Sequence, residues 1–245
     1  MQSPTSFSFL RGRLRHWLGN LPSQCAICRS WPARPVCEAC VARFAAPRHR
    51  CRTCALPLPQ SATHCGECLR HPPPLDLCIA CCDYAWPWSE RIAEFKFRDE
   101  TGWAAPLATL MRSTPWAEPL LDEADHVLPM PLAHARLRER GFNQAHELAR
   151  RLAPAKADAT LLLRVHNTPP QAGLPRAKRL QNLRGAFALD PLRAHAVQGK
   201  RIVLVDDVMT SGASLFTAAQ TLRAAGAAHV AAMVLARTPR PENSK

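Results

Sequence analysis

The sequence that decides the fold is RIVLVDDVMTSGAS, residues 201–214. It begins with four consecutive apolar residues, Ile202 to Val205, three of them β-branched. Such an unbroken apolar run is typical of a parallel strand that is buried on both faces. Two carboxylates, Asp206 and Asp207, follow directly, and then come a turn of small residues and a helical pattern that ends before Gly226. We expect a strand over 201–206, a tight loop, and a helix over 212–225.

The residues at the end of this strand suit a phosphorylated sugar. Ligands of open α/β sheets bind at the carboxyl ends of the strands, and carboxylates accept hydrogen bonds from vicinal ribose hydroxyls. Thr210 and Ser211 offer hydroxyl groups, and Gly212 carries no Cβ that would keep a phosphate from the backbone N–H groups. The helix N-terminus favours an anion. An ordinary strand–turn–helix unit, in which one aspartate caps the turn, is the alternative.

In these residues the chain resembles the type I phosphoribosyltransferases, whose signature for phosphoribosyl pyrophosphate (PRPP) it matches. The resemblance implies that Asp206 and Asp207 are the catalytic acids and hold the ribose. It also implies a set of 5′-phosphate-binding residues: Thr210, Ser211, Gly212, Ala213 and Ser214. Mg²⁺ would accompany PRPP, because this hard cation prefers oxygen ligands. Purine-salvage members have an acid at the position of Thr210, so the threonine argues against that role.

Eight of the eleven cysteines form four C-x2-C pairs, and such pairs are typical of structural zinc sites. The predicted ligands are Cys25, Cys28, Cys37, Cys40, Cys51, Cys54, Cys65 and Cys68. They predict two zinc ions, each held by four thiolates in a zinc-ribbon module. Sequential pairing needs the shortest loops, and a crossed pairing, disulfides or an iron–sulfur cluster are the alternatives. The remaining three, Cys78, Cys81 and Cys82, lie in a predicted strand, where we expect them in the core rather than at a third metal.

Two basic segments follow predicted strands and are candidates for binding pyrophosphate. Arg136, Arg138 and Arg140 come after a predicted strand at 126–132, at the position where phosphoribosyltransferases hold pyrophosphate. Arg176, Lys178 and Arg179 lie between the second and third core strands, where these enzymes carry a mobile loop. A solvated basic turn and a basic surface helix, respectively, are the alternatives.

Together with the cysteine pairs, these two basic segments make the chain similar to one family in particular, the ComF/ComFC family. The similarity spans nearly the whole chain. It rests on RLRERGFNQ (residues 136–144), on the segment from Gln171 to Phe187, and on the cysteine pairs that precede the core. The segment EFKFR, residues 94–98, is also similar to the end of a helix in that family. The resemblance implies a bacterial cytoplasmic protein associated with competence or the use of external DNA. It leaves the acceptor substrate undefined.

Composition limits the class of protein. The chain has 245 residues, 47% of them apolar, and a net charge of +13. It has no apolar run of 18 residues and no signal-peptide pattern, so we expect a cytoplasmic protein without membrane insertion. Residues 130–200 carry 13 Lys/Arg against 4 Asp/Glu, which fits a polyanionic ligand such as PRPP or nucleic acid.

The expected architecture is α/β, because predicted strands alternate with helices along the chain. We expect an N-terminal lead-in and double zinc-ribbon module over 1–72, then a prolyl linker, and a parallel-sheet phosphoribosyltransferase-like domain over 75–240. Strands are predicted at 75–85, 126–132, 159–164, 201–206 and 229–236, and helices at 88–98, 103–112, 143–153 and 212–225.

A second class of function, binding of single-stranded DNA with or without PRPP sensing, fits the same charge. Such binding needs exposed aromatic rings on which bases stack. The candidate rings, which we expect to lie in the core instead, are Trp31, Trp86, Trp88, Trp103 and Trp116. Other competence proteins are further candidate partners. The chain is therefore expected either to transfer a phosphoribosyl group or to bind DNA, or sense PRPP, with the same fold.

Overall fold

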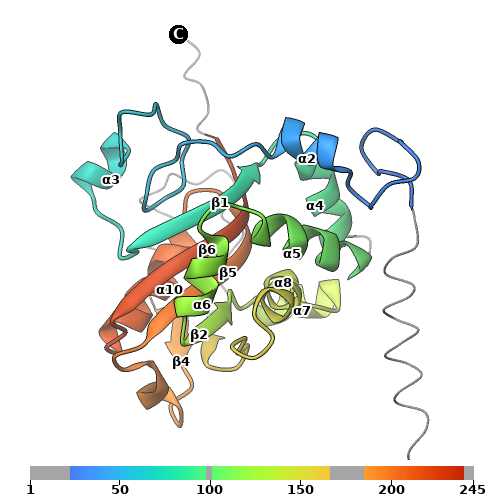
Figure 1. Cartoon of the computed structure of the whole chain (residues 1–245). Helices are drawn as coiled ribbons and strands as arrows, with labels where there is room; N and C mark the ends of the chain where they lie inside the picture. The colour runs from blue at the N-terminus through green and yellow to red at the C-terminus, as the bar shows by residue number, and fades with distance from the viewer. Residues whose placement is uncertain (1–22, 98–100, 166–184, 240–245) are drawn as a thin grey trace, which may run out of the picture. The chain divides into compact units, whose positions relative to one another are not determined.

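The computed structural model describes residues 23–97, 101–165 and 185–239. The chain forms two compact units, residues 1–43 and residues 44–245. The centre of the second unit is a four-stranded parallel sheet in the order β1-β6-β5-β2 (Figure 1). Its strands are β1 (Leu77–Asp83), β2 (His126–Pro129), β5 (Arg201–Met209) and β6 (His229–Arg237). The apolar run that was predicted to be buried, Ile202 to Val205, lies in an inner strand, where it is covered on both faces.

Helices cover both faces of this sheet, which confirms the α/β prediction. They are α4 (Trp88–Phe97), α5 (Ala104–Arg112), α6 (Ala117–Glu123), α7 (His134–Arg140), α8 (Gln144–Leu152) and α10 (Ala213–Ala224), with 3-10 turns η1 (Thr101–Trp103) and η2 (Ala194–Val197). Helices α5 and α8 pack on each other on one side of the sheet, and α10 packs on the other side (Figure 1). None of the described helices is long and apolar enough to cross a membrane.

The prediction of a core strand at 159–164 is wrong. Leu162–Arg164 forms β3, which pairs antiparallel with β4 (Phe187–Leu189) in a separate two-stranded sheet. Leu162 is buried, whereas Leu163 is exposed. This alternation is that of a ribbon covered on one face, and a short apolar run does not distinguish such a ribbon from a central strand.

Strand β5 extends three residues beyond its predicted end. It continues to Met209 because β6 runs alongside it, with Met209 opposite Arg237. Asp206 and Asp207 therefore lie within the paired part of the strand, and their side chains point to opposite faces of the sheet. Strand β2, in contrast, ends at Pro129, earlier than predicted.

The predicted helices at 88–98, 103–112, 143–153 and 212–225 are present as α4, α5, α8 and α10, whereas α6 was not predicted. Helix α8 begins after Asn143, whose side chain accepts hydrogen bonds from the backbone N–H groups of Ala145 and His146. Helix α10 is followed by Gly226 in the left-handed conformation, as expected. The local sequence signals for helix ends therefore hold in this chain.

Candidate functional site

The acidic pair, Asp206 and Asp207, lies near the carboxyl end of β5, next to helix α4. Asp207 is 8% exposed, and its Oδ1 lies 3.0 Å from Nζ of Lys96 in the last turn of α4. Asp206 Oδ1 accepts a hydrogen bond of 2.9 Å from the backbone N–H of Asp207. Two adjacent carboxylates and one ammonium group thus share the end of the strand.

The environment of the acidic pair favours protonation of one acid. Burial and the negative charge of Asp207 raise the pKa of Asp206 to about 7, against the opposing positive charges of Lys96 and Arg164. A group with this pKa changes its charge around neutral pH. Hydroxyl donors or a divalent cation placed beside Asp206 would favour its ionised form, so the site is suited to a ligand that brings either one.

The loop from Thr210 to Ser214, which we call the phosphate loop after its predicted role, leads from β5 into the N-terminus of α10. Thr210 is exposed and Ser211 is half-buried, so both hydroxyls are close to solvent. Gly212 has a φ of +79°, and a Cβ there would lie 2.4 Å from Met209 Cε and 2.7 Å from Phe216 Cζ. The backbone conformation therefore favours glycine, and a Cβ would also displace the ends of the Met209 and Phe216 side chains. The first N–H groups of α10 have no acceptor within the helix, which makes this loop suitable for a phosphate.

Arg164 of β3 lies near Asp206 of the acidic pair, and Arg136 of α7 lies near Arg164. Burial and the positive charge of Arg136 lower the pKa of Arg164, whereas the negative charge of Asp206 raises it. Arg164, at the end of β3, also lies over the ring of Phe187 at 5.6 Å from the centroid. The positive charges of these two guanidinium groups repel each other, and a bound anion would reduce this repulsion.

The basic residues predicted from the sequence do not all lie together. Arg136 is the one of the three arginines of α7 whose charge acts on Arg164. Arg140 instead donates a hydrogen bond of 3.0 Å to Gln144 Oε1 of α8, and Arg138 is rotated by about 200° around the helix from Arg136. The other three, Arg176, Lys178 and Arg179, lie outside the described residues.

Sequence reasoning assigned no role at the site to Lys96 or Arg164. Lys96 belongs to the EFKFR segment, which was noted for its resemblance to the ComF family, so a signal was present. Arg164 is at the end of the short strand that was assigned to the wrong sheet, and its sequence neighbours carry no signal of a site.

The eight C-x2-C cysteines form two groups in sequential pairing. The first cysteine cluster contains Cys25, Cys28, Cys37 and Cys40, and the second contains Cys51, Cys54, Cys65 and Cys68. Within each cluster all four Sγ atoms lie within 4.8 Å of one another. Cys78, Cys81 and Cys82 are buried in β1 and belong to neither cluster, as expected for core residues.

The two clusters are built alike. In each, the first pair lies in a turn followed by a residue with positive φ, Arg29 in one and Ala55 in the other. The second pair lies at the start of a short helix, α2 (Glu38–Phe44) or α3 (Gly66–Arg70). Backbone N–H groups of Cys37 and Cys65 point at Sγ of Cys25 and Cys51, at 3.4 and 3.3 Å. Such donors stabilise thiolates.

The sulfur geometry fits a metal and does not fit disulfides. Sγ–Sγ distances are 3.8 Å for Cys25–Cys40, 3.6 Å for Cys28–Cys37 and 3.7 Å for Cys54–Cys65. A tetrahedral site with Zn–S bonds of about 2.3 Å has sulfur–sulfur edges of about 3.8 Å. A disulfide bond is much shorter, at about 2.05 Å. Both clusters could therefore hold a zinc ion through four thiolates.

Comparisons with known proteins agree with the fold described above. The phosphoribosyl transferase domain family matches residues 90–245. DNA utilization protein YhgH of Escherichia coli strain K12 is 32% identical over 232 residues, which cover 89% of this chain and 98% of that protein. Competence protein F of Haemophilus influenzae is 34% identical over 195 residues, covering 76% and 84%.

Two further matches are more partial. Competence protein ComFC of Bacillus subtilis is 31% identical over 150 residues, covering 61% of this chain and 59% of that protein. The crystal structure of TT1426 from Thermus thermophilus covers 61% of this chain and 88% of that chain, with a TM-score of 0.31 and 22% identity. The family match agrees with the parallel sheet and its helices, and together with these relatives it shows that the chain belongs to the ComF family of phosphoribosyltransferase-domain proteins.

Proposed function

We propose that the chain binds PRPP with Mg²⁺ at the acidic pair and the phosphate loop, as a phosphoribosyltransferase of the ComF type. The observation that carries the proposal is the ion pair between Lys96 and Asp207, next to a glycine-dependent loop at the start of α10. Carboxylates, a phosphate-sized loop and cations lie together there, and PRPP is a ribose that carries a phosphate and a pyrophosphate.

Each group has a chemical role in this proposal. The ribose hydroxyls donate hydrogen bonds to the acidic pair, and the phosphate loop holds the 5′-phosphate. Arg136 and Arg164 neutralise the pyrophosphate as it leaves. Mg²⁺, when bound, neutralises further charge on the pyrophosphate. The anomeric carbon loses its bond to pyrophosphate and forms a bond to an acceptor nitrogen, which releases its proton, while the protein keeps the partners aligned.

The acceptor is the undefined part of the reaction. Thr210 stands where purine-salvage enzymes have an acid, so we propose an acceptor other than a free purine base. Release of pyrophosphate from PRPP, measured across nucleobases, amines and nucleic-acid fragments, tests transfer. Turnover with one class, lost in Asp206→Ala/Asp207→Ala, supports it. Binding of PRPP without turnover on any acceptor would reduce the domain to a PRPP sensor.

A role in competence or in the use of external DNA follows from the relatives, whose names refer to DNA utilization and competence. We extend that role to this chain, together with a cytoplasmic location and contacts to other competence proteins. Both cysteine clusters would hold structural zinc, because four protein thiolates leave no open position for a substrate.

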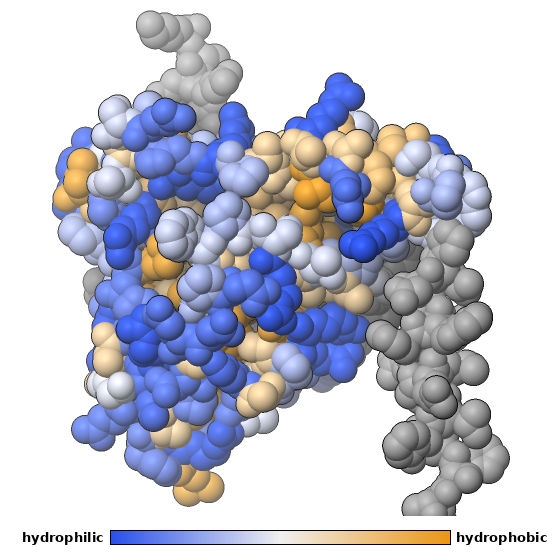
Figure 2. All heavy atoms as spheres, viewed as in Figure 1, coloured by the Kyte–Doolittle hydropathy of each residue, from blue (hydrophilic) through white to orange (hydrophobic). Residues whose placement is uncertain are grey.

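Binding of single-stranded DNA is the second candidate function, and the exposed tryptophans favour it. Trp88 and Trp103 are buried, but Trp31, Trp86 and Trp116 are largely exposed, contrary to the expectation of a core role. The ring of Trp86 meets that of Phe44 edge-on at 5.0 Å between centroids. Figure 2 shows hydrophilic side chains over much of the visible face, with apolar side chains in smaller patches. An exposed aromatic ring can stack on a base.

The two candidates differ in their response to salt and to substitution. DNA binding through phosphates should weaken steeply as salt rises, and Trp86→Ala should weaken it further without changing affinity for PRPP. Fluorescence anisotropy with a labelled oligonucleotide measures both effects. Affinity that does not change with salt, or with Trp86→Ala, would remove the DNA-binding candidate.

A further inference from the structure

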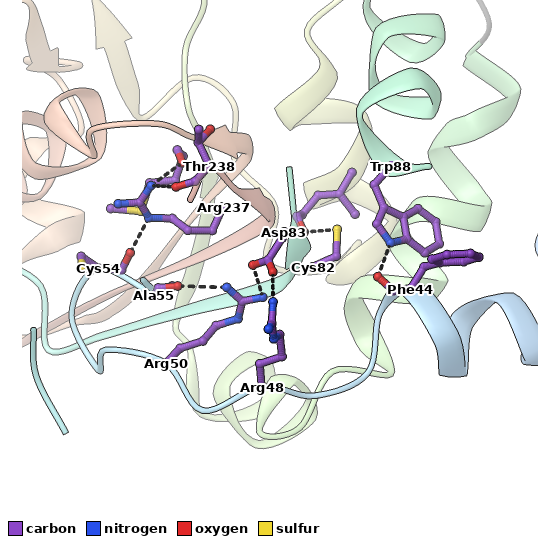
Figure 3. Close-up of polar contacts among 12 residues, drawn as sticks. Phe44, Arg48, Arg50, Cys54, Ala55, Cys82, Asp83, Trp88, Arg237 and Thr238 are labelled. Atoms are coloured by element: carbon purple, nitrogen blue, oxygen red, sulfur yellow. Dashed lines mark hydrogen bonds and ion pairs between the residues drawn. The ribbon is translucent and has the colours of Figure 1, made fainter. Parts of the chain in front are cut away.

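One buried arginine connects the second cysteine cluster to the phosphate loop. Arg237, the last residue of β6, is 7% exposed. Figure 3 shows its polar contacts. Its Nε donates a hydrogen bond of 2.8 Å to the carbonyl oxygen of Cys54. Its Nη1 donates to the carbonyl oxygens of Met209, at 3.1 Å, and of Thr210. A single guanidinium group therefore bonds a cluster cysteine and the entry to the phosphate loop at the same time.

The positive charge of Arg237 is buried and needs a negative counter-charge, which no Asp or Glu among the described residues supplies. In the described part of the chain, Arg237 forms no ion pair with an Asp or Glu, and its bonds go to backbone carbonyls. A buried cation without a counter-charge is costly. Four thiolates around a zinc ion carry a net negative charge, which would provide that counter-charge.

The Cys54 carbonyl is held in place by the turn that brings the cysteines together. The backbone N–H of Ala55 donates to the carbonyl of Cys51 at 2.8 Å, and Ala55 has a φ of 54°. Arg50 donates to the carbonyl of Ala55 at 3.2 Å and pairs with Asp83 of β1 at 2.8 Å (Figure 3). The turn is thus anchored to the sheet on one side by Arg50 and on the other by Arg237.

Apolar packing forms a second connection between the same two parts. The second cluster and the start of α10 belong to one buried core, which includes Met209 and Phe216. Cys78 Sγ lies 3.7 Å from Met209 Sδ, and Met209 Cε occupies the space beside Gly212 where a Cβ would be. A shift of the cluster would therefore reach the phosphate loop through packing as well as through Arg237.

We propose that Arg237 is a positioning residue through which the metal-loaded second cysteine cluster holds the phosphate loop ready for its ligand. Loss of metal from this cluster loosens residues 209–214 and weakens binding there. The ligand part of this inference rests on the proposed function. The first cysteine cluster belongs to the other compact unit, so we expect the loop to be unaffected by the loss of its metal.

The test compares Arg237→Gln with Arg237→Lys and with a matched control, Arg223→Gln. Arg223 also donates to two carbonyl oxygens, those of Ala227 and Ala228, and in addition pairs with Asp76, all at the end of α10 away from the phosphate loop. Each full-length protein is first shown to be folded and to contain the wild-type amount of zinc. Amide hydrogen exchange over residues 206–216 without ligand, and the Kd for PRPP with Mg²⁺ by calorimetry, are then measured.

Arg237→Gln should speed exchange over 206–216 and weaken PRPP binding by on the order of tenfold, since it removes charged hydrogen bonds. Arg237→Lys should give a smaller effect, because it keeps the charge but cannot bond as many carbonyls. Arg223→Gln should change neither. Unchanged exchange in Arg237→Gln would overturn the inference. Faster exchange in that variant, with no PRPP binding even by the wild type, would overturn the proposed function and leave the link intact.

The metal arm uses Cys54→Ser and, as its control, Cys28→Ser in the first cluster. The expected result is faster exchange over 206–216 in Cys54→Ser alone. If Cys54→Ser does not fold, partial removal of zinc from the wild type with a chelator, followed by the same exchange measurement, replaces it. Equal effects of both cysteine variants, or none from losing the second zinc, would contradict the coupling.

Discussion

Nζ of Lys96 lies 3.0 Å from Oδ1 of Asp207, and both side chains are largely buried. The ion pair joins the last turn of α4 to β5, so the position of this helix sets the distance between the Lys96 ammonium group and the acidic pair. The positive charge of Lys96 also lowers the pKa of Asp206, against burial and the charge of Asp207. The charge state of the site thus depends on a residue more than a hundred positions earlier in the sequence.

Replacing Lys96 should raise the pKa of Asp206 further above its value of about 7. Lys96→Met removes one of the two cations that oppose the effects of burial and of Asp207 on this acid. Carboxyl ¹³C NMR titration would measure the change, with Lys96→Arg as the control that keeps the charge. An unchanged Asp206 titration in Lys96→Met would contradict the assigned ion pair.

Asp206 should reduce the stability of the ligand-free protein as pH rises. Its pKa is raised from 3.8 to about 7 in the folded state, so its favourable contribution is present below pH 4 and is lost as pH approaches 7. Asp206→Asn should therefore be more stable than the wild type at pH 8, by on the order of a few kcal/mol, and should lose this advantage toward acid pH.

Urea unfolding at pH 8 and at pH 5.5, with zinc present, measures this difference. Asp125→Asn is the control with the opposite sign. Hydrogen bonds from the backbone N–H of Arg201 and from Lys200 lower the pKa of Asp125, so its loss should destabilise the protein at pH 8. If Asp206→Asn were less stable than the wild type at both pH values, the raised pKa would be wrong.

Arg164 and Arg138 should differ in their effect on anion binding. Arg164→Gln removes a cation that acts on Asp206, so binding of pyrophosphate should weaken by roughly tenfold. Arg138→Gln lowers the net charge equally, but Arg138 lies on another side of α7 from Arg136, and its effect should stay below about twofold. Calorimetric titration with pyrophosphate compares them, and equal effects would point to general charge rather than to this site.

A side chain at Gly212 should destabilise the folded protein and weaken ligand binding. Gly212→Ala places a Cβ in a left-handed backbone position and against Met209 and Phe216, which should cost about 1–3 kcal/mol and displace the phosphate loop. Gly102→Ala is the control, because no atom lies within 4 Å of a Cβ built there. Thermal unfolding and PRPP binding report the two effects. A Gly212→Ala protein with wild-type stability and binding would show that the loop does not need this conformation.

The sequence predicts the part of the site that is local. The strand, the acidic pair, the phosphate loop and α10 follow one another along the chain. Their signals in the sequence are, in the same order, an apolar run, two adjacent charges, small residues and helical spacing. The sequential cysteine clusters also follow from spacing, because two short C-x2-C turns close a four-thiolate site with little chain between them.

The contacts between distant elements could not be predicted. Lys96 meets Asp207, and Arg237 meets Cys54, between parts of the chain that lie far apart in the sequence. The wrong assignment of β3 to the main sheet also reflects a long-range contact. A strand of only three residues, Leu162–Arg164, carries too little sequence pattern to specify its partner strand. A single sequence reports local preference, whereas these positions depend on long-range packing.

The central claim is that the acidic pair and the phosphate loop form a PRPP site. Calorimetric titration of the zinc-loaded protein with PRPP and Mg²⁺ tests it most directly, beside the variant Asp206→Asn/Asp207→Asn. Saturable binding at one site, tighter at pH 8 than at pH 6 as Asp206 ionises and lost in the variant, is the predicted result. Absence of binding by the folded wild type, or equal binding by the variant, would contradict the claim.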